Sequence, residues 1–442
     1  MAFSDERRSL LSSNARISAP FIKVTIGDYT FGVFSRSERQ LLKQGDFYKA
    51  YDIKYPNYIK SLAVTKINGQ VNQYTLTIVY PVTTNDDPNF FEKVFSSVSN
   101  TRKIIFTYGD ATKPAFIYKD EEAIITKVNT SFGGFQGGQF NGVLTYTVSA
   151  TSSAALGTAS TIQRPSDGAY HKPSDLIKAM FRDPSTGLRN VFTGMNDGNL
   201  DKLIAGDDQA VKLDSKLNIS ALDYLSYLVS CMIPNGSINA QLANDIYILT
   251  IHDDTIYDDL LQEGNRQLSG PYFQVTKTSY RTKHADAYQI DIGSPNSKDL
   301  ILSFSVDDNE NYSLYYDYQG KLNDQKYKKV VNRFGQIVDM YAPSATSKNN
   351  NFETNAQDRS WWTKITKFPI SASITLRGLL RPAQLMTYVR INMIFPGTGK
   401  KHISSGLYIV TKQLDKIDEQ GYTTTLNMTK IAGDTEGETV RY

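Results

Sequence analysis

The residues of this sequence that could carry out chemistry are mainly carboxylates. Adjacent Asp or Glu residues occur at positions 86 and 87, 121 and 122, 253 and 254, 258 and 259, and 307 and 308. Hydrolysis of a sugar chain needs two carboxyl groups that face each other across a cleft, one of them with a raised pKa. Adjacency in sequence does not supply that arrangement, and Asp87 before Pro88 is typical of a helix start. We therefore predict no catalytic pair.

Metal and thiol chemistry have little support in the sequence. The histidines at 171, 252, 284 and 402 show no His-x-x-x-His spacing. His252 with Asp253 and Asp254 comes nearest to a metal site, but a solvated polar turn after a strand at 245–251 is the favoured interpretation. Cys231, the single cysteine, lies in the apolar run 224–233, which favours a buried inert thiol. We expect no metal, no cofactor and no disulfide.

The glycine-rich segment 133–138 resembles a phosphate-binding loop only in composition. It lacks the Lys-Ser or Lys-Thr that follows such a loop, and it lies between predicted strands rather than before a helix. Ser404 and Ser405 are not in a nucleophile-elbow pattern. We therefore predict a flexible loop at 133–138 and no acyl-transfer site.

Two basic clusters and a tryptophan pair are the candidate contact residues. Cationic side chains neutralise phosphates, so the clusters could line a channel for DNA, and a solvated helix face and a loop tip are the alternative. We place the tryptophans partly in a core and partly at a subunit contact, with stacking on a sugar as the alternative. These residues are Lys326, Lys328, Lys329, Arg333, Lys400 and Lys401, with Trp361 and Trp362.

Length and composition indicate a multidomain, tyrosine-rich protein. The chain has 442 residues, a formal charge of +3, and 28 Tyr against 2 Trp. This length predicts two to four domains, and the near-balanced charge argues against a dedicated nucleic-acid binder. Tyrosine favours half-buried sheet faces and subunit contacts. The sequence has no apolar export signal and no apolar run of roughly 20 residues, so we expect a cytoplasmic origin and no membrane span.

Periodicity predicts a β-rich unit at residues 1–150. Alternating runs on either side of Asn68 and Gly69 predict a hairpin, because this dipeptide favours a tight turn. Apolar residues at helical spacing predict one helix after Asp87. Antiparallel strands around one helix are typical of a small barrel or sandwich with the helix packed on one side.

The rest of the chain divides into three predicted segments. A Ser- and Ala-rich linker spans 151–165, and a mixed α/β insert spans 166–270, with helices at 173–182 and 220–232. Residues 271–442 return to strands around a helix at 327–341 and a loop at 343–358. Strands, a helix and more strands thus occur twice. No sequence identity between the two halves is visible, so the duplication rests on element order.

The end of the chain carries a family resemblance. Residues 369–413 read PISASITLRGLLRPAQLMTYVRINMIFPGTGKKHISSGLYIVTKQ, and the hairpin strand that follows reads GYTTTLNMTKIAGD. This closing pattern resembles the hub proteins of phage tail baseplates and the related base of the type VI secretion spike. The resemblance implies a mainly β fold, with two tail-tube-type antiparallel β-barrel domains, each with a packed helix, and a mixed α/β middle domain.

The resemblance also implies a function and partners. Three copies with two barrels each would form a ring that joins a hexameric tail tube to a trimeric spike or tail tip. Such a hub is not an enzyme, forms part of the DNA ejection channel and is located in the virion baseplate after assembly in the host cytoplasm. Its expected partners are further copies, the tube and spike proteins, other baseplate proteins and, transiently, DNA or the tape-measure protein. A cell-wall-degrading enzyme and a glycan-binding receptor module are the alternatives.

Overall fold

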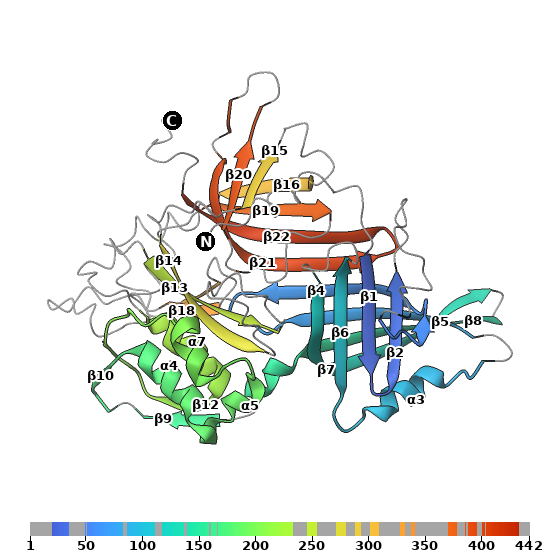
Figure 1. Ribbon diagram of the computed structural model, residues 1–442, viewed down its shortest axis with the longest axis horizontal. Coiled ribbons are helices and arrows are strands. Elements are labelled where there is room, and N and C mark those ends of the chain that lie inside the picture. Colours follow the sequence, from blue (N-terminus) through green and yellow to red (C-terminus); the bar gives the residue numbers. More distant parts are fainter. Residues whose placement is uncertain are drawn as a thin grey trace.

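The computed structural model shows two β-rich units and a mixed α/β unit (Figure 1). It describes residues 20–34, 49, 51–82, 86–110, 117–136, 139–158, 161–165, 167–232, 245–253, 271–279, 288–292, 301–308, 328–331, 337–340, 370–377, 385, 388–395, 400–402 and 404–432.

The N-terminal β unit is a sheet that closes on itself. Its strands are β1 (Pro20–Ile26), β2 (Tyr29–Phe34), β3 (Tyr55–Pro56), β4 (Ile59–Ile67), β5 (Gln73–Pro81), β6 (Lys103–Asp110), β7 (Tyr118–Gln136) and β8 (Gln139–Ser152). They pair in the order β4-β5-β8-β7-β6-β1-β2-β3. Asn57 N donates to Gly32 O on β2 at 3.0 Å, and Val79 N on β5 donates to Tyr58 O at 2.8 Å. The segment between β3 and β4 therefore joins the two ends of the sheet.

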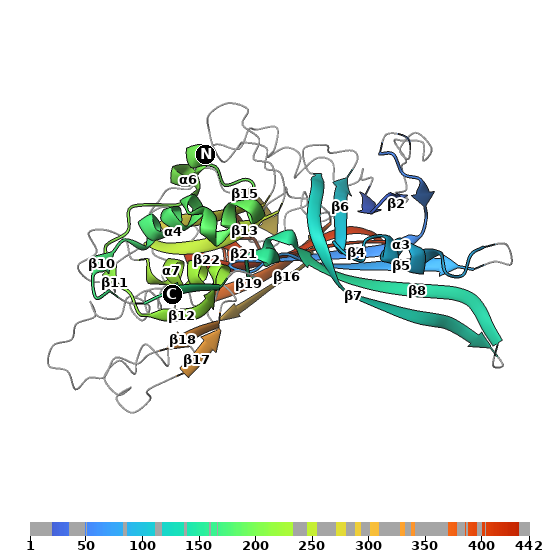
Figure 2. The same cartoon turned by 90° about the horizontal axis from the view of Figure 1, so that it is seen from below.

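A helix and a hairpin complete this unit. Helix α3 (Phe90–Ser97) buries Phe91 and Val94 in the barrel core, where the rings of Phe91 and Tyr146 are 5.2 Å apart. It begins at Phe90 rather than at the predicted Asp87, whose Oδ1 instead accepts from Asn89 N at 2.9 Å. The predicted Asn68-Gly69 turn is confirmed, with Gly69 at φ +73°. Figure 2 shows the β7–β8 hairpin extending beyond the rest of the unit.

The middle unit packs helices against a two-stranded sheet. Helices α4 (Pro173–Arg182), α5 (Leu188–Val191), α6 (Asp197–Leu203) and α7 (Ala221–Cys231) share one apolar core with β13 (Asp245–His252) and β14 (Tyr272–Ser279). Cys231 lies in that core, as predicted. Shorter elements surround it: η2 (Ser153–Thr158), β9 (Thr161–Arg164), β10 (Tyr170–His171), η3 (Pro184–Thr186), β11 (Val211–Lys212) and β12 (Lys216–Ser220).

The C-terminal β unit has its own apolar core. Its strands are β15 (Tyr288–Ile292), β16 (Ile301–Asp308), β19 (Ile370–Arg377), β20 (Tyr388–Met393), β21 (Gly406–Asp418) and β22 (Gly421–Ala432). The order β16-β19-β22-β21-β20 repeats the order β4-β5-β8-β7-β6 of the N-terminal unit, and every neighbouring pair in both series is antiparallel. The units differ at the next strand, because β6 pairs antiparallel with β1 whereas β20 pairs parallel with β15.

The predicted helix over 327–341 is wrong. The structure has a hairpin of β17 (Lys328–Val331) and β18 (Ile337–Met340), paired antiparallel. Val330, Val331, Ile337 and Val338 are β-branched, which favours strands, and the apolar spacing alone did not reveal this. The fold class is otherwise confirmed as mainly β with an α+β insert. Within the described ranges, no helix is long and apolar enough to cross a membrane.

Candidate functional site

The closing hairpin joins the two β units into one sheet. The first part of β21 pairs with β20, from Gly406 opposite Ile391 to Ile409 opposite Tyr388. The second part pairs with β4 of the other unit, from Lys412 opposite Ile67 to Ile417 opposite Leu62. We call this β21–β4 pairing the seam. Figure 1 shows β21 and β22 lying along the N-terminal unit.

The seam is buried on its inner face. Ile417 and Leu62, opposite each other, are 2% and 1% exposed, and both belong to the core of the N-terminal unit together with Tyr422 of β22. Burying a side chain of this size contributes about 1.5–3 kcal/mol. The tip of the C-terminal hairpin is therefore part of the N-terminal core rather than an added edge.

A cluster of buried polar side chains lies beside the seam. Its members come from all three units, and we call it the junction cluster: Lys66, Tyr74, Tyr108, Tyr118, Glu121, Asp253, Gln413 and Asp415. Buried polar groups cost free energy unless they are hydrogen-bonded, so such a cluster holds its units in one relative arrangement.

The ion pair of Lys66 and Glu121 is the centre of the junction cluster. Lys66 Nζ lies 2.6 Å from Glu121 Oε1, and both side chains are almost fully buried. Tyr74 and Tyr108 each donate a hydroxyl hydrogen bond to Glu121 Oε2 at 3.0 Å. Burial, followed by the nearby charge of Glu121, raises the pKa of both tyrosines well above its usual value. Lys66 Nζ also lies 3.8 Å from the ring centroid of Tyr118, a cation–π contact.

Asp415 extends the cluster into the C-terminal hairpin. Its Oδ1 accepts from Thr424 Oγ1 at 2.7 Å and from Tyr422 OH at 3.1 Å, while Oδ2 accepts from Gln413 Nε2 at 2.5 Å. Gln413 Nε2 also donates to Tyr118 OH at 2.6 Å. Burial raises the pKa of the Asp415 carboxyl, and the charge of Lys66 opposes that rise.

Asp253 connects the middle unit to the same cluster. Its Oδ1 accepts from Ser152 Oγ at 2.5 Å, and its Oδ2 lies 3.4 Å from Tyr74 OH. Asp253 and His252 are both buried, so the predicted solvated turn at this point is wrong. His252 stacks on Tyr272 with ring centroids 4.6 Å apart and lies 2.9 Å from Thr250 Oγ1. The contact with the barrel keeps this polar sequence out of water.

The adjacent carboxylates Glu121 and Glu122 do not share a site. Glu121 is buried in the junction cluster, whereas Glu122 lies on the other face of β7 and pairs with Lys103 at 2.6 Å. Asp87 pairs with Lys93 at 2.5 Å on the surface. In the described part of the chain, no three His, Cys, Asp or Glu side chains are grouped so that they could hold a metal ion.

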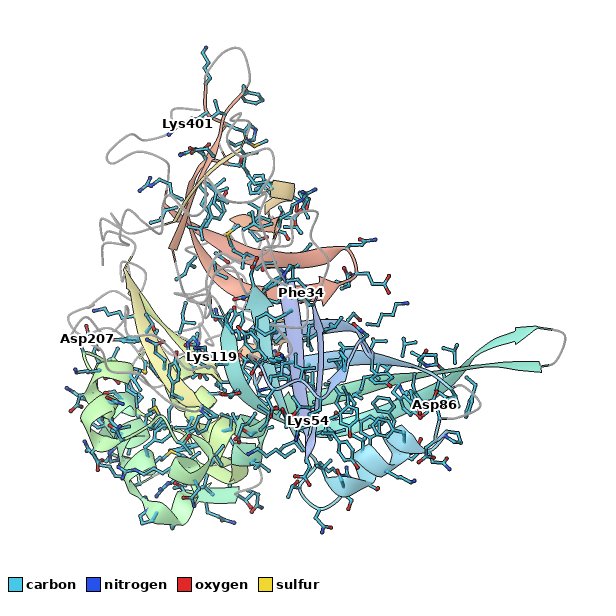
Figure 3. The ribbon with its side chains drawn as sticks, turned by 45° about the vertical axis from the view of Figure 1, so that its right-hand side comes forward. Phe34, Lys54, Asp86, Lys119, Asp207 and Lys401 are labelled. Carbon is cyan, nitrogen blue, oxygen red and sulfur yellow. The ribbon has the colours of Figure 1, made fainter. Side chains whose placement is uncertain are left out.

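The predicted contact residues fall partly outside the described ranges. Lys326, Arg333, Trp361 and Trp362 lie outside the described residues, and Lys328 and Lys329 belong to β17. Lys400 and Lys401 are exposed between β20 and β21, and Lys401 Nζ donates to Asn392 Oδ1 at 3.1 Å. Figure 3 shows Lys401 at the outer end of the C-terminal unit.

The sequence patterns did not predict the junction cluster, although one of its residues stands at a telling position. Alternation along β7 places Glu121 on the same face as the buried Ala123 and Ile125. A carboxylate at an inward position of a strand indicates a buried partner. Its partner Lys66 lies 55 residues earlier, so only the folded structure identifies it.

Comparison by sequence finds no matching protein family and no matching curated protein. Solved structures that the chain matches include a tail protein from Neisseria meningitidis MC58, at 10% identity and TM-score 0.45, covering 93% of this chain and 96% of that one. The 43 kDa tail protein of prophage MuSo2 from Shewanella oneidensis has 9% identity and TM-score 0.44, with the same coverage. A component of the E. coli type VI secretion system has 8% identity and TM-score 0.40, covering 85% of this chain and 75% of its own.

Proposed function

We propose that the protein is a structural component of a phage tail, the hub of its baseplate. The observation that carries this proposal is the seam, which joins two β units of the same strand order edge to edge within one chain. Three such chains present six units. A ring of three chains would therefore match a sixfold tail tube on one side and a threefold spike or tail tip on the other.

The proposed role is symmetry adaptation and involves no covalent step. Closed rotational symmetry holds each subunit on two sides, so moderate contacts produce a stable ring. The junction cluster supports this role, because it fixes both β units and the middle unit in one arrangement. The partners in this proposal are the tube protein, the spike or tail-tip protein and other baseplate proteins, and ejected DNA would pass through the ring.

The test is the stoichiometry and shape of the purified assembly. Native mass spectrometry should give three copies or a multiple of three, and negative-stain microscopy should show a ring with threefold symmetry. Tail tube protein added to the ring should stack on one face. A monomer or dimer that binds neither tube nor spike protein would contradict the proposed function.

A further inference from the structure

Among the described strands, the outer part of β7 has an open backbone edge. On one side β7 pairs with β8 from Ala123 to Gln136, whereas on the other it pairs with β6 only as far as Ile124. Ile125 N still donates to Arg102 O at 2.8 Å, but no described strand adjoins β7 on that side from Lys127 onward. Unpaired backbone groups on a strand edge are a template for pairing with another strand.

Strand β16 is a second open edge among the described strands, at one end of the sheet. It pairs with β19, and no other described strand adjoins it. Ser303, Ser305 and Asp307 are exposed on it, while Phe304 and Val306 are half-buried on the other face. The described sheet of one chain thus includes two edges, one along the outer part of β7 and one along β16, that could accept a further strand.

The repeated strand order assigns each open edge a counterpart inside the chain. Because β21 stands in the C-terminal unit where β7 stands in the N-terminal unit, and β16 stands where β4 stands, the open edges correspond to the two sides of the seam. In β21 the part next to β20 is followed by the part that pairs with β4. In β7 the part next to β6 is followed by the open edge.

One irregularity of register in the β7–β8 ladder has a counterpart in the β21–β22 ladder. The β7–β8 ladder shifts between Ile125 and Lys127, and the β21–β22 ladder shifts between Val410 and Lys412. Aligning these shifts matches the sequence Ile-Ile-Thr-Lys at 124–127 with Ile-Val-Thr-Lys at 409–412. The two halves therefore share a short local identity that the sequence alone did not reveal.

A second pair of shifts fixes the alignment of the partner strands. The β4–β5 ladder shifts between Ile59 and Ser61, and the β16–β19 ladder shifts between Ile301 and Ser303. Bulges are specific structural features rather than defects, so their coincidence indicates true correspondence of the strands. Each residue pair of the seam therefore has an equivalent pair of positions on the two open edges.

We propose that the outer edge of β7 in one copy pairs antiparallel with β16 of a second copy, in the register of the seam. The partner is thus another copy of this chain, and the claim that three copies close a ring rests on the proposed function. Translating the seam places five pairs opposite each other: Val128 and Asp308, Asn129 and Asp307, Thr130 and Val306, Ser131 and Ser305, and Phe132 and Phe304.

The exposed Phe132 is explained by this pairing. Its counterpart Ile417 is buried against Leu62 at the seam, whereas Phe132 is 61% exposed in the single chain. In the proposed pairing Phe132 lies opposite Phe304, and cross-strand aromatic pairs stabilise antiparallel sheets. An exposed large apolar side chain beside an open strand edge is a feature of an assembly surface.

Charge is also complementary along the proposed pairing. Lys127 is exposed at the start of the β7 edge. In the translated register it lies diagonal to Asp307, on the same face of the sheet, within reach of a long side chain. The pairing is head to tail, so each copy uses a different edge on each side, and such contacts close into a ring when the rotation allows.

Paired cysteines test the register directly. Cys231 is buried, so the native chain adds little background. Chains carrying Ser131→Cys are mixed with chains carrying Ser305→Cys and oxidised, since opposite residues on paired strands come close enough for a disulfide. We expect a disulfide between chains for this mixture and much less for Ser131→Cys mixed with Ser303→Cys, which is out of register.

Two further variants control for geometry and folding. Lys416→Cys with Ala63→Cys in one chain reproduces the same pair at the seam, so it should form a disulfide within the chain. Phe132→Ser should weaken association by roughly tenfold, because truncating a central aromatic anchor removes a large part of the contact energy. Its unfolding midpoint should stay close to that of the native protein, since Phe132 is exposed in the single chain.

The outcomes separate this inference from the proposed function. An assembly of three copies without the disulfide between positions 131 and 305 would overturn the pairing and leave the hub intact. In-register disulfides in open filaments, without a threefold ring, would support the pairing and contradict the hub. Monomers without disulfides would overturn both.

Discussion

At the scale of single residues, the buried ion pair of Lys66 and Glu121 is the centre of the contact between the units. Moving a charged group out of water costs free energy. In this pair the attraction between the two charges offsets that cost, together with two tyrosine hydroxyls that bond to Glu121 and a tyrosine ring that contacts Lys66. Removing one partner leaves the other charged and unpaired. The pair therefore contributes more to the arrangement of strands than to net stability.

Replacing Lys66 by Met should be strongly destabilising. We expect a loss of about 3–5 kcal/mol in the free energy of unfolding, because Glu121 would remain buried without its cation. Lys103→Met is the matched control, since Lys103 pairs with Glu122 on the other face of the same strand in a half-exposed ion pair, and its loss should cost about 0–1 kcal/mol. Urea denaturation measures both. Equal effects of the two substitutions would show that the buried pair has no special role.

The pKa of Asp415 predicts a specific dependence on pH. Its carboxyl has a raised pKa in the folded protein, so the folded state holds the proton more tightly than the unfolded state. The stability contributed by this group is then present below the usual carboxyl pKa and is lost as the pH rises through the raised value. Asp415→Asn, which cannot ionise, should gain stability relative to the native protein as the pH rises above the usual carboxyl pKa. Denaturation midpoints of both proteins at a series of pH values measure the difference, and a difference that does not change with pH would contradict the raised pKa.

At the scale of elements, local patterns predicted most strands and helices of the described residues. Alternation and the Asn68-Gly69 turn gave the β4–β5 hairpin, and helical spacing with Ser220 gave α7. The predicted helix at 327–341 is wrong for a physical reason. A short apolar run fits the period of a helix and that of a strand, and the β-branched residues of this run favour strands. Local patterns also placed the hairpin β21–β22 in the C-terminal unit, and they could not show that its tip completes the N-terminal core.

Helix α7 provides an element-scale test through the cap at its start. Ser220 Oγ accepts from Asp223 N at 3.0 Å, which satisfies a backbone group at the helix start. Ser220→Ala should lower the free energy of unfolding by about 1 kcal/mol. Ser226→Ala, in the middle of the same helix, removes a hydroxyl that bonds only to the carbonyl of Leu222 among the described contacts, and it should have a smaller effect. A larger effect of Ser226→Ala in thermal unfolding would contradict the assigned cap.

At the scale of the whole molecule, pairings between distant residues determine the architecture. Glu121 meets Lys66, Tyr74 meets Asp253, and Gln413 meets Tyr118 across 295 positions of the chain. No local pattern contains this information, so the sequence predicted a doubled element order but neither the seam nor the junction cluster. The short identity between 124–127 and 409–412 became visible only when the strand registers aligned the two halves.

The doubled architecture suggests a role for the two open edges, the outer part of β7 and strand β16. A chain whose two units are joined by one seam needs the same seam between chains to continue the sheet, and the two open edges have the strand positions that this requires. The residues at the edges, Phe132 and Lys127 on one and Phe304 and Asp307 on the other, are complementary in size and charge. The inference thus follows from topology and register together.

The native mass of the purified protein under assembly conditions tests the proposed ring most directly. We expect three chains, or a multiple of three, and the Phe132→Ser variant should shift this population toward single chains. A protein that remains a strict monomer or dimer at concentrations where its partners assemble would contradict the claim that two units per chain serve a sixfold ring.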